Sequence, residues 1–362
     1  MATVYDRALD QERTADLEQK LQQMLNQGGL SLMISVGHRV GLFDVMGNMD
    51  SATSQEIAER SGLRERCVRD WLSAMVHGGI VEYETIIKTY RLPSEHAALF
   101  TRSAGLNNYA STARWISIFG KIEDDLVECF RKEGSIPCTV FSSLQSELVA
   151  ENSVSVVNGL FRHVLPLAPS LILGLCEGLD VLDLGCGAGA TLMELAVAFP
   201  KSRFVGYDMS EEDIRRARRS AEARGISNIT FITRDISQIH AICSFDLITA
   251  FDVIHDQAYP FQILDEIHTA LRPAGILLMQ NPVASHSFEK QSDHPLSPLL
   301  STISCLRSMA FPAEQDLAPA VTEWGEEKTC QTLEEIGFEN VAIHQLPHDM
   351  LSYFYVAIKQ AE

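Results

Sequence analysis

Apolar and polar positions alternate at helical spacing through the first part of the chain. Apolar residues recur every three or four positions over residues 11–48, which predicts helices there. A capping box at residues 53–56 predicts the start of a short helix, and a further helix is predicted from about Arg64 to His77. Two short stretches, at residues 80–83 and 89–92, then predict a hairpin. The first hundred residues are therefore predicted to form a mainly helical domain with a two-stranded wing.

The rhythm of the chain changes after Gly178. Residues 96–175 are predicted to be mostly helical with loops, and an apolar helix is predicted from Val164 to Leu175. Beyond Gly178, short apolar runs alternate with helical patterns, which is typical of a parallel sheet covered by helices on both faces. The last two runs lie too close together for a crossover helix, so their strands are predicted to pair antiparallel. The predicted strands are residues 180–184, 203–207, 229–233, 245–250, 276–280, 341–346 and 353–358, and the predicted helices lie near 190–199, 211–224 and 259–271.

Composition limits what the chain can do. It has 362 residues, of which 46% are hydrophobic and 21% charged, as is ordinary for a globular protein of about two domains. Its formal net charge of -19 opposes binding to nucleic acid or anionic membranes unless a local basic patch exists. No apolar run of about 18 residues is present and residues 1–20 lack the apolar core of a signal peptide, so a cytoplasmic protein is expected. The eight cysteines form no C-x-x-C pair and indicate neither a zinc site nor a disulfide framework.

The stretch from Val181 to Ala190 is the most informative part of the chain. An apolar run ends in three alternating glycines, Gly185, Gly187 and Gly189, and a helical pattern follows. This order predicts a buried strand, a tight turn and the start of a helix. Glycines have no Cβ and let a ligand approach the main chain closely, and a helix start offers unpaired N–H groups with a partial positive charge. The turn therefore predicts a site for an anionic or carboxylate-bearing cofactor.

Acidic residues follow the next two predicted strands. Asp208 ends the second strand and Asp235 follows the third, so both are expected at the carboxyl edge of the sheet, where open α/β folds bind ligands. Asp208 can accept hydrogen bonds from ribose hydroxyls and Asp235 from an adenine amino group, with Ile236 beside the ring. The glycine spacing also fits the dinucleotide-binding pattern. Asp183, just before the first glycine, would oppose a pyrophosphate but suits an ammonium group.

These residues resemble the motifs of class I S-adenosylmethionine-dependent methyltransferases. Residues 182–189 match the first motif of that family, Asp208 and Asp235 stand where it binds ribose and adenine, and residues 271–277 resemble its L-x-P-G-G-x-L turn, with Ala274 in place of one glycine. The resemblance implies an α/β fold, a seven-stranded Rossmann-like methyltransferase domain, and S-adenosyl-L-methionine as cofactor. The cofactor-binding residues that it implies are Asp183, Gly185, Gly187, Gly189, Asp208, Met209, Asp235, Ile236 and Phe251.

The whole chain also resembles a narrower group, the two-domain methyltransferases with an N-terminal winged-helix domain found among uncharacterised mycobacterial and invertebrate proteins. It is similar to small-molecule O-methyltransferases. The segments that carry this resemblance are residues 57–63, 68–72, 92–98 and Trp324–Gly325. It implies a winged-helix-like dimerisation and substrate-cover domain at residues 1–100, a helical linker at residues 101–154, and an S-adenosylmethionine-dependent methyltransferase domain at residues 155–362.

The segment after the fourth predicted strand carries the candidate chemistry. His255-Asp256 resembles the H-D-W-x-D segment of small-molecule O-methyltransferases, where the histidine is a general base, although Gln257 replaces the tryptophan. A histidine can take a proton from a hydroxyl while the methyl group transfers in line, because its pKa lies near neutrality. The alternative is a histidine that only hydrogen-bonds locally or positions substrate. His255 and Asp256 are the candidate catalytic residues, and oxygen is the favoured methyl acceptor.

A winged helix raises a second function, that of a transcriptional regulator that binds S-adenosylmethionine as a ligand. The predicted recognition helix carries Arg64, Arg66 and Arg69, but residues 1–100 contain 10 lysines and arginines against 14 aspartates and glutamates. Binding to DNA requires a basic face, which this domain lacks by count. A third alternative is a binding protein that has lost turnover. The favoured prediction is a homodimeric enzyme for a small-molecule acceptor, without membrane or nucleic-acid partners, whose dimer interface is formed by the helices of residues 15–48.

Overall fold

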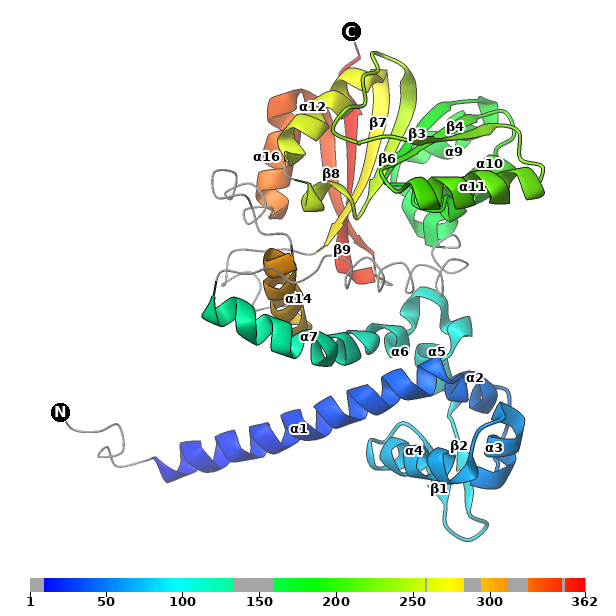
Figure 1. Ribbon diagram of the computed structural model, residues 1–362, viewed down its shortest axis with the longest axis vertical. Coiled ribbons are helices and arrows are strands. Elements are labelled where there is room, and N and C mark those ends of the chain that lie inside the picture. The colour runs from blue at the N-terminus through cyan, green and yellow to red at the C-terminus, as the bar shows by residue number, and fades with distance from the viewer. Residues whose placement is uncertain are drawn as a thin grey trace, which may run out of the picture. The chain divides into compact units, whose positions relative to one another are not determined.

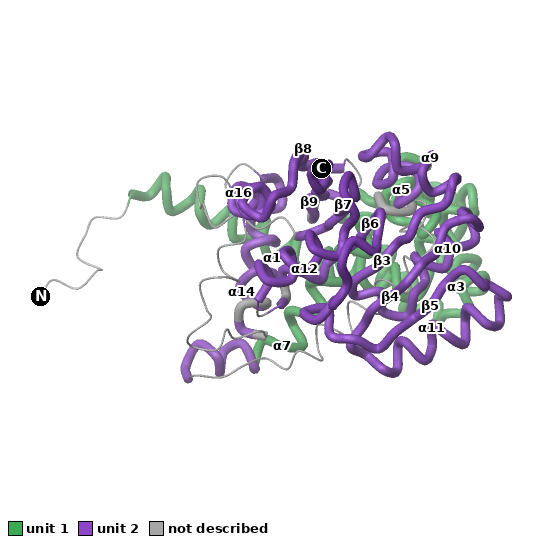
Figure 2. The backbone as a smooth tube through the Cα atoms, turned by 90° about the horizontal axis from the view of Figure 1, so that it is seen from above, with its two compact units in different colours: residues 1–124 green, residues 125–362 purple. Residues whose placement is uncertain are grey.

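The computed structural model divides into two compact units, residues 1–124 and residues 125–362 (Figure 2). The predicted domain limits at residues 100 and 154 stay a prediction, and much of the predicted linker lies outside the described residues, as does Trp324. The residues that the structure describes are 10–132, 159–257, 259–282, 294–310, 325–346 and 349–361.

The first unit is mainly helical, as the spacing of its apolar residues predicts. Its long first helix, α1 (Gln11–Arg39), contacts α4 (Glu65–His77) near Gly37. A Cβ on Gly37 would lie 2.5 Å from the ring of Trp71, so a larger residue does not fit there. Trp71 also donates a hydrogen bond from its indole N–H to the Met33 carbonyl (2.8 Å). The two helices are thus fixed by one close approach and one buried polar contact.

The winged part of this unit follows the predicted order of elements. α3 (Ser54–Ser61) begins with the predicted capping box, in which Thr53 accepts a bond from the Glu56 N–H and the Glu56 carboxylate accepts one from the Thr53 N–H. The predicted hairpin is confirmed as an antiparallel pair. The other elements are α2 (Leu42–Gly47), β1 (Glu82–Glu84), β2 (Thr89–Arg91), α5 (Ser94–Phe100), η2 (Arg102–Asn107), α6 (Tyr109–Thr112) and α7 (Arg114–Arg131), which crosses the boundary between the units.

The second unit is built on a seven-stranded sheet (Figure 1). Its strand order is β5-β4-β3-β6-β7-β9-β8. The strands from β5 to β7 pair in parallel, whereas β9 pairs antiparallel with β7 and β8, so the predicted antiparallel ending is confirmed. The chain reverses its direction of winding between β3 and β6, and that switch point is where such sheets bind ligands. The strands are β3 (Asp180–Leu184), β4 (Arg203–Asp208), β5 (Ile229–Thr233), β6 (Phe245–Phe251), β7 (Leu271–Pro282), β8 (Phe338–Leu346) and β9 (Asp349–Lys359).

Side chains alternate between the two faces of this sheet and form a separate core on each. Val181 and Leu247 lie in the core covered by α9, α10 and α11, whereas Leu182 and Ile248 lie in the core covered by α12 and α16. Burial on both faces explains why the strands appear in the sequence as nearly continuous apolar runs. The helices of this unit are α9 (Pro169–Glu177), α10 (Ala190–Ala198), α11 (Glu211–Ala223), α12 (Pro260–Ala270), α14 (Ser297–Ala310) and α16 (Glu326–Ile336).

One predicted helix is wrong in its extent. The apolar stretch from Val164 to Leu175 is bent by 106° between the helical segments Leu160–Leu167 and Pro169–Glu177. A proline disfavours helical backbone at the residue before it, and Ala168 is extended, with φ -113° and ψ 94°. This bent pair has the length and composition of a broken membrane span, but no single helix among the described residues is long and apolar enough to cross a membrane.

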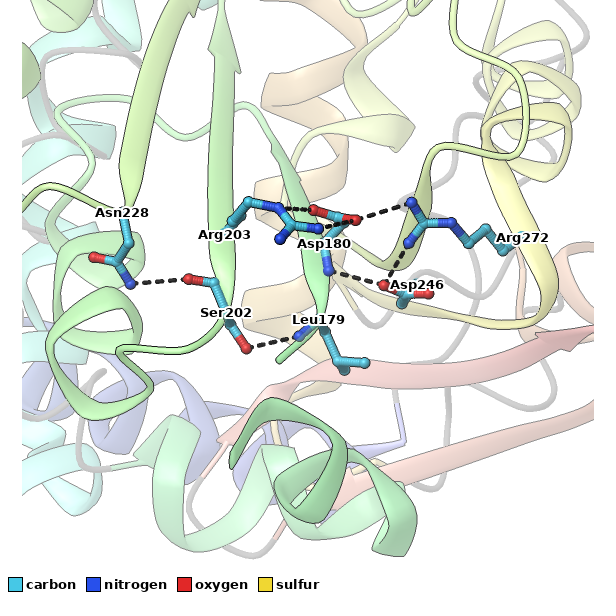
Figure 3. A network of polar contacts seen from close by, with 7 residues as sticks. All are labelled: Leu179, Asp180, Ser202, Arg203, Asn228, Asp246 and Arg272. Atoms are coloured by element: carbon cyan, nitrogen blue, oxygen red, sulfur yellow. Dashed lines mark hydrogen bonds and ion pairs between the residues drawn. The ribbon is translucent and has the colours of Figure 1, made fainter. Parts of the chain in front are cut away.

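Ion pairs join four strands at the amino edge of the sheet (Figure 3). Asp180, the first residue of β3, accepts bonds from Arg203 of β4 (2.6 and 2.7 Å) and from Arg272 of β7 (2.9 Å). Arg272 also donates to Asp246 of β6 (2.6 Å), and that carboxylate accepts the Asp180 N–H (2.8 Å). The Arg203 guanidinium, together with that of Arg272, holds the pKa of the Asp180 carboxyl below its usual range. These contacts fix the edge opposite to the one where the strands end.

Candidate functional site

The turn between β3 and α10 lies at the carboxyl edge of the sheet. The N–H groups of Gly185 and Cys186 both donate to the Tyr207 carbonyl near the end of β4 (2.8 and 3.1 Å). Gly185, Gly187 and Gly189 have φ values of 71°, 52° and 72°, a region that residues with a side chain rarely adopt. Gly189 directly precedes α10 and provides no side-chain cap. The turn therefore presents main-chain donors at a helix N-terminus, where an anionic group binds favourably.

The three glycines serve two purposes. A Cβ at Gly189 would lie 2.4 Å from the Phe231 ring, and a Cβ at Gly185 would lie 2.7 Å from a methyl carbon of Val253, so both positions are closely packed. Around a Cβ at Gly187, no atom of the described residues lies within 4 Å. Gly187 is thus the glycine that leaves the main chain open to a ligand.

Asp208 is fixed against this turn at the end of β4. Its Oδ2 accepts the Gly187 N–H and its Oδ1 accepts the Ser210 N–H, both at 2.8 Å. Each oxygen keeps a further lone pair, so the carboxylate can still accept bonds from two neighbouring hydroxyls. The next residue, Met209, has an exposed side chain. The predicted partner of a ribose is therefore in hydrogen-bond contact with the glycine turn.

Arg234 joins the loop after β5 to the end of β4, and no motif in the sequence marks it. Its backbone N–H donates to the Asp208 carbonyl (2.9 Å). Its guanidinium donates to the Tyr207 hydroxyl (3.2 Å) and to the Ile239 carbonyl (3.0 Å), and its Cζ lies 4.8 Å from the centroid of the Tyr207 ring. Because Asp235 is the next residue, these contacts hold the second predicted acidic residue near the first.

Asp235 and Ile236 begin the turn that follows. The Oδ1 atom of Asp235 accepts the Ser237 N–H (2.9 Å), which fixes the half-buried carboxylate within its own loop. Ile236 is buried in the core on the α12 face of the sheet. The contacts of both residues with an adenine ring stay a prediction.

Asp183 lies in the interior beneath the turn. It is 7% exposed and pairs in register with Thr249 of β6, whose hydroxyl donates to its Oδ1 at 2.6 Å. Burial raises the pKa of the Asp183 carboxyl to about 7. The bond from Thr249 opposes this rise, and the negative charge of Asp208 adds to it. A carboxyl with such a pKa changes its charge readily when a cation arrives. Thr249, like Arg234, is a residue that no sequence motif marks.

The chain turns sharply after β6 and carries the candidate base to the same edge. Asp252 has a positive φ of 53°, and the single 3₁₀ turn η5 (Ile254–Asp256) follows it. Both His255 and Asp256 lie in this turn, and the His255 side chain is half-buried. Their catalytic roles stay a prediction.

The segment after β6 lies against the glycine turn. β6 is the neighbour of β3 in the sheet, and Val253 stands directly over Gly185. Phe251 is half-buried at the end of β6 and packs against the core on the α10 face. The structure thus gathers the glycine turn, Asp183, Asp208 and this segment at one edge.

Within the described part of the chain, no group of three or more His, Cys, Asp or Glu side chains could hold a metal ion.

Comparison with protein families assigns the two parts of the chain. Residues 28–102 match the family described as Rv2258c-like winged HTH domain, and residues 175–335 match the family described as methyltransferase domain. The chain therefore combines a winged-helix domain with a methyltransferase domain. The predicted fold class, a winged helix followed by a seven-stranded Rossmann-like domain, is thereby confirmed.

Relatives and solved structures agree with this assignment. The chain is 33% identical to sterol 24-C-methyltransferase erg6 of Aspergillus fumigatus over 117 residues, which cover 32% of this chain and 30% of that protein. The matches span less than a third of the length of the first curated relatives. Human N-acetylserotonin methyltransferase in complex with S-adenosylmethionine has a TM-score of 0.66 at 15% identity, covering 100% of each chain. CalO1, a methyltransferase in calicheamicin biosynthesis in its S-adenosylhomocysteine-bound form, has a TM-score of 0.65 at 14% identity, covering 97% of this chain and 100% of that one.

Proposed function

We propose that the protein transfers a methyl group from S-adenosyl-L-methionine to a small-molecule acceptor, with oxygen as the favoured acceptor atom. The observation that carries this proposal is the glycine turn at the switch point of the sheet, with Gly187 open and its N–H bonded to Asp208. Such a turn fits a nucleoside that lies against bare main chain and a ribose held by a carboxylate. The similarity to CalO1 and to the human enzyme, whose structures hold S-adenosylhomocysteine and S-adenosylmethionine, supports the same cofactor.

The residues of the site match the parts of this cofactor. Asp208 accepts bonds from the ribose hydroxyls, Asp235 accepts from the adenine amino group, and Asp183 lies beneath the turn as the receptor for the ammonium group. When bound, the cofactor supplies an electrophilic methyl group on a sulfonium. The apolar residues assigned to the same site are Met209, Ile236 and Phe251, and the main-chain surface is that of Gly185, Gly187 and Gly189.

Calorimetric titration with S-adenosylhomocysteine tests the cofactor assignment. One molecule is expected to bind each chain, with an increase in the melting temperature because a ligand that binds only the folded state stabilises it. Transfer of a labelled methyl group from S-adenosylmethionine to a library of small hydroxyl compounds then tests the reaction. An absence of both heat and thermal shift contradicts the proposed function.

His255 is proposed as the general base, with Asp256 beside it, and the variant His255→Ala tests this. The rate of methyl transfer is expected to fall about 10- to 100-fold, toward the lower end of general-base effects because the sulfonium is already a good leaving group. The affinity for S-adenosylhomocysteine is expected to stay within about twofold, and His255→Gln separates loss of the proton acceptor from loss of a hydrogen bond. An unchanged rate with a true acceptor removes His255 from the mechanism.

A homodimer formed through α1 is proposed on the exposed apolar face of that helix. Leu21 is 50% exposed and Leu25 is 77% exposed, one helical turn apart, with Leu17 and Met24 on the same face. A stripe of this kind on a soluble helix commonly marks an interface. The double substitution Leu21→Glu/Leu25→Glu is therefore expected to convert a dimer to a monomer in sedimentation velocity.

The control for the dimer is a pair of substitutions that adds the same charge on the opposite face of α1. Gln19→Glu/Gln23→Glu is expected to sediment as the wild-type protein. A wild-type protein that is already monomeric at about 10 µM contradicts the homodimer, since stable biological interfaces hold at such concentrations.

The winged helix is proposed to support this dimer and to cover the acceptor in a cytoplasmic enzyme, without contacts to membranes or nucleic acid. On its recognition helix Arg69 is already paired with Glu65 (3.6 Å), which reduces the positive charge that α4 offers to a phosphate backbone. A gel-shift assay at physiological salt is expected to show no bound DNA.

A further inference from the structure

We propose that Thr249 is a positioning residue whose hydroxyl holds the Asp183 carboxyl and allows it to be either protonated or ionised, so that cofactor binding is coupled to the release of a proton from Asp183. This inference rests on the proposed function, because the cation that Asp183 receives is the ammonium group of the cofactor. It adds Thr249 of β6, whose hydroxyl bonds to the Asp183 carboxyl and favours its ionised form.

The geometry around the Thr249 hydroxyl suits both charge states. Thr249 is 2% exposed, and its Oγ1 lies 2.6 Å from Asp183 Oδ1 and 3.4 Å from the Leu182 carbonyl oxygen. A hydroxyl has one donor and two acceptor positions. When Asp183 is ionised, Thr249 donates to the carboxylate. When Asp183 is protonated, its O–H donates to Thr249, and the hydroxyl hydrogen turns to the Leu182 carbonyl. Neither state leaves the buried hydroxyl hydrogen without an acceptor, which would be costly.

The surroundings of Asp183 oppose its ionisation until a cation arrives. From β4, the negative charge of Asp208 acts on it, and burial acts in the same direction. The Cys186 thiol in the turn stays uncharged, because burial and the neighbouring carboxylates raise its pKa. Thr249 on β6 is the group that favours the ionised form, and no cation of the described chain acts on Asp183. An incoming ammonium group therefore supplies the missing positive charge, and the proton of Asp183 leaves to solvent.

The test is the pH dependence of S-adenosylhomocysteine binding in the wild-type protein, Thr249→Val and Thr249→Ser. Below about pH 7 the wild-type Kd is expected to rise about tenfold per pH unit, as release of one proton requires. Thr249→Val keeps the shape of the side chain but removes the donor to the carboxylate. In this variant the rise of Kd toward acid pH is therefore expected to begin about one pH unit higher, and the Kd at pH 7 is expected to be about fivefold higher than that of the wild type. Thr249→Ser keeps the hydroxyl and is expected to follow the wild-type curve.

A purely structural role for Thr249 gives a different result. A displacement of the site that leaves the titration of Asp183 unchanged weakens binding by the same factor at every pH. Loss of the hydroxyl instead weakens binding on the acid side, and the curves converge above about pH 8.5. The ligand's own amino group loses its proton above about pH 8, which weakens binding equally in all variants. If Thr249→Val does not fold, Thr249→Ala replaces it in the same series.

A second readout uses the protein without ligand. The infrared band of the protonated Asp183 carboxyl, assigned by difference from Asp183→Asn, is expected to disappear near pH 7 in the wild type and about one unit higher in Thr249→Val. A wild-type Kd that is equal at pH 5.5 and 7.5, or a Thr249→Val titration that coincides with the wild type, overturns the inference while the cofactor assignment stands. If S-adenosylhomocysteine binds no variant at pH 8, the proposed function fails, and the infrared titration still decides the role of Thr249.

Discussion

Replacing Gly187 by alanine is expected to weaken the binding of S-adenosylhomocysteine about 100-fold while the protein stays folded. Within the described chain no atom lies within 4 Å of the new Cβ, so the fold bears only the strain of alanine at a φ of 52°, about 1 kcal/mol. The N–H that binds Asp208 is kept. The Cβ instead enters the space above the turn, where an overpacked contact with the adenosyl group costs about 1–3 kcal/mol, and the upper end of that range corresponds to the expected loss of affinity. Calorimetry and urea denaturation measure the two effects separately.

Gly225→Ala is the matched control for this substitution. Gly225 has a φ of 66° and, as at Gly187, no described atom would lie within 4 Å of its new Cβ, but it follows α11 at the amino edge of the sheet. It is expected to lose the same stability without any loss of affinity. If Gly187→Ala binds the ligand as tightly as Gly225→Ala does, the cofactor does not lie against this turn.

The glycine turn and Asp208 were predictable because their signals are local. A buried strand, three spaced glycines and a helix follow one another within a few residues, and Asp208 ends the next strand. Parallel strands joined by helices bring their carboxyl ends to one edge, so the neighbourhood of the two features follows from topology. The structure adds the bond from the Gly187 N–H to the carboxylate, which no pattern in the sequence specifies.

Thr249 and Arg234 were not predictable because their contacts depend on register. Thr249 meets Asp183 only because β6 lies beside β3 with these two residues opposite each other, 66 positions apart in the chain. Arg234 reaches the Tyr207 hydroxyl across 27 positions. A change of register by one residue would turn the Thr249 side chain to the other face of the sheet. By contrast, the bend before Pro169 had a local signal, and the apolar periodicity of the stretch outweighed it in the prediction.

In the absence of ligand, the free energy of unfolding of Asp183→Asn is expected to increase relative to that of the wild type as the pH rises. The wild-type carboxyl has a pKa of about 7 in the folded protein, against about 3.9 in an unfolded chain. A raised folded-state pKa contributes stability that is complete below the unfolded pKa and is lost as the pH rises through 7, because the unfolded chain gives up the proton first. Between pH 5 and pH 8 the wild type is therefore expected to lose about 2–3 kcal/mol relative to the asparagine variant, measured by urea denaturation at both pH values.

The same variant is expected to bind S-adenosylhomocysteine about 100-fold more weakly at pH 8, since it keeps an oxygen for Thr249 but offers no charge to the ammonium group. At pH 5.5 the gap closes, because the wild-type carboxyl is then protonated too. Asp180→Asn is the matched control: its carboxyl has a lowered pKa, so its stabilisation is present above the unfolded pKa and lost in acid. That control is expected to lose stability at pH 8 and to keep its affinity. If Asp183→Asn behaves like Asp180→Asn, the buried carboxyl is a structural group and not the receptor of a cation.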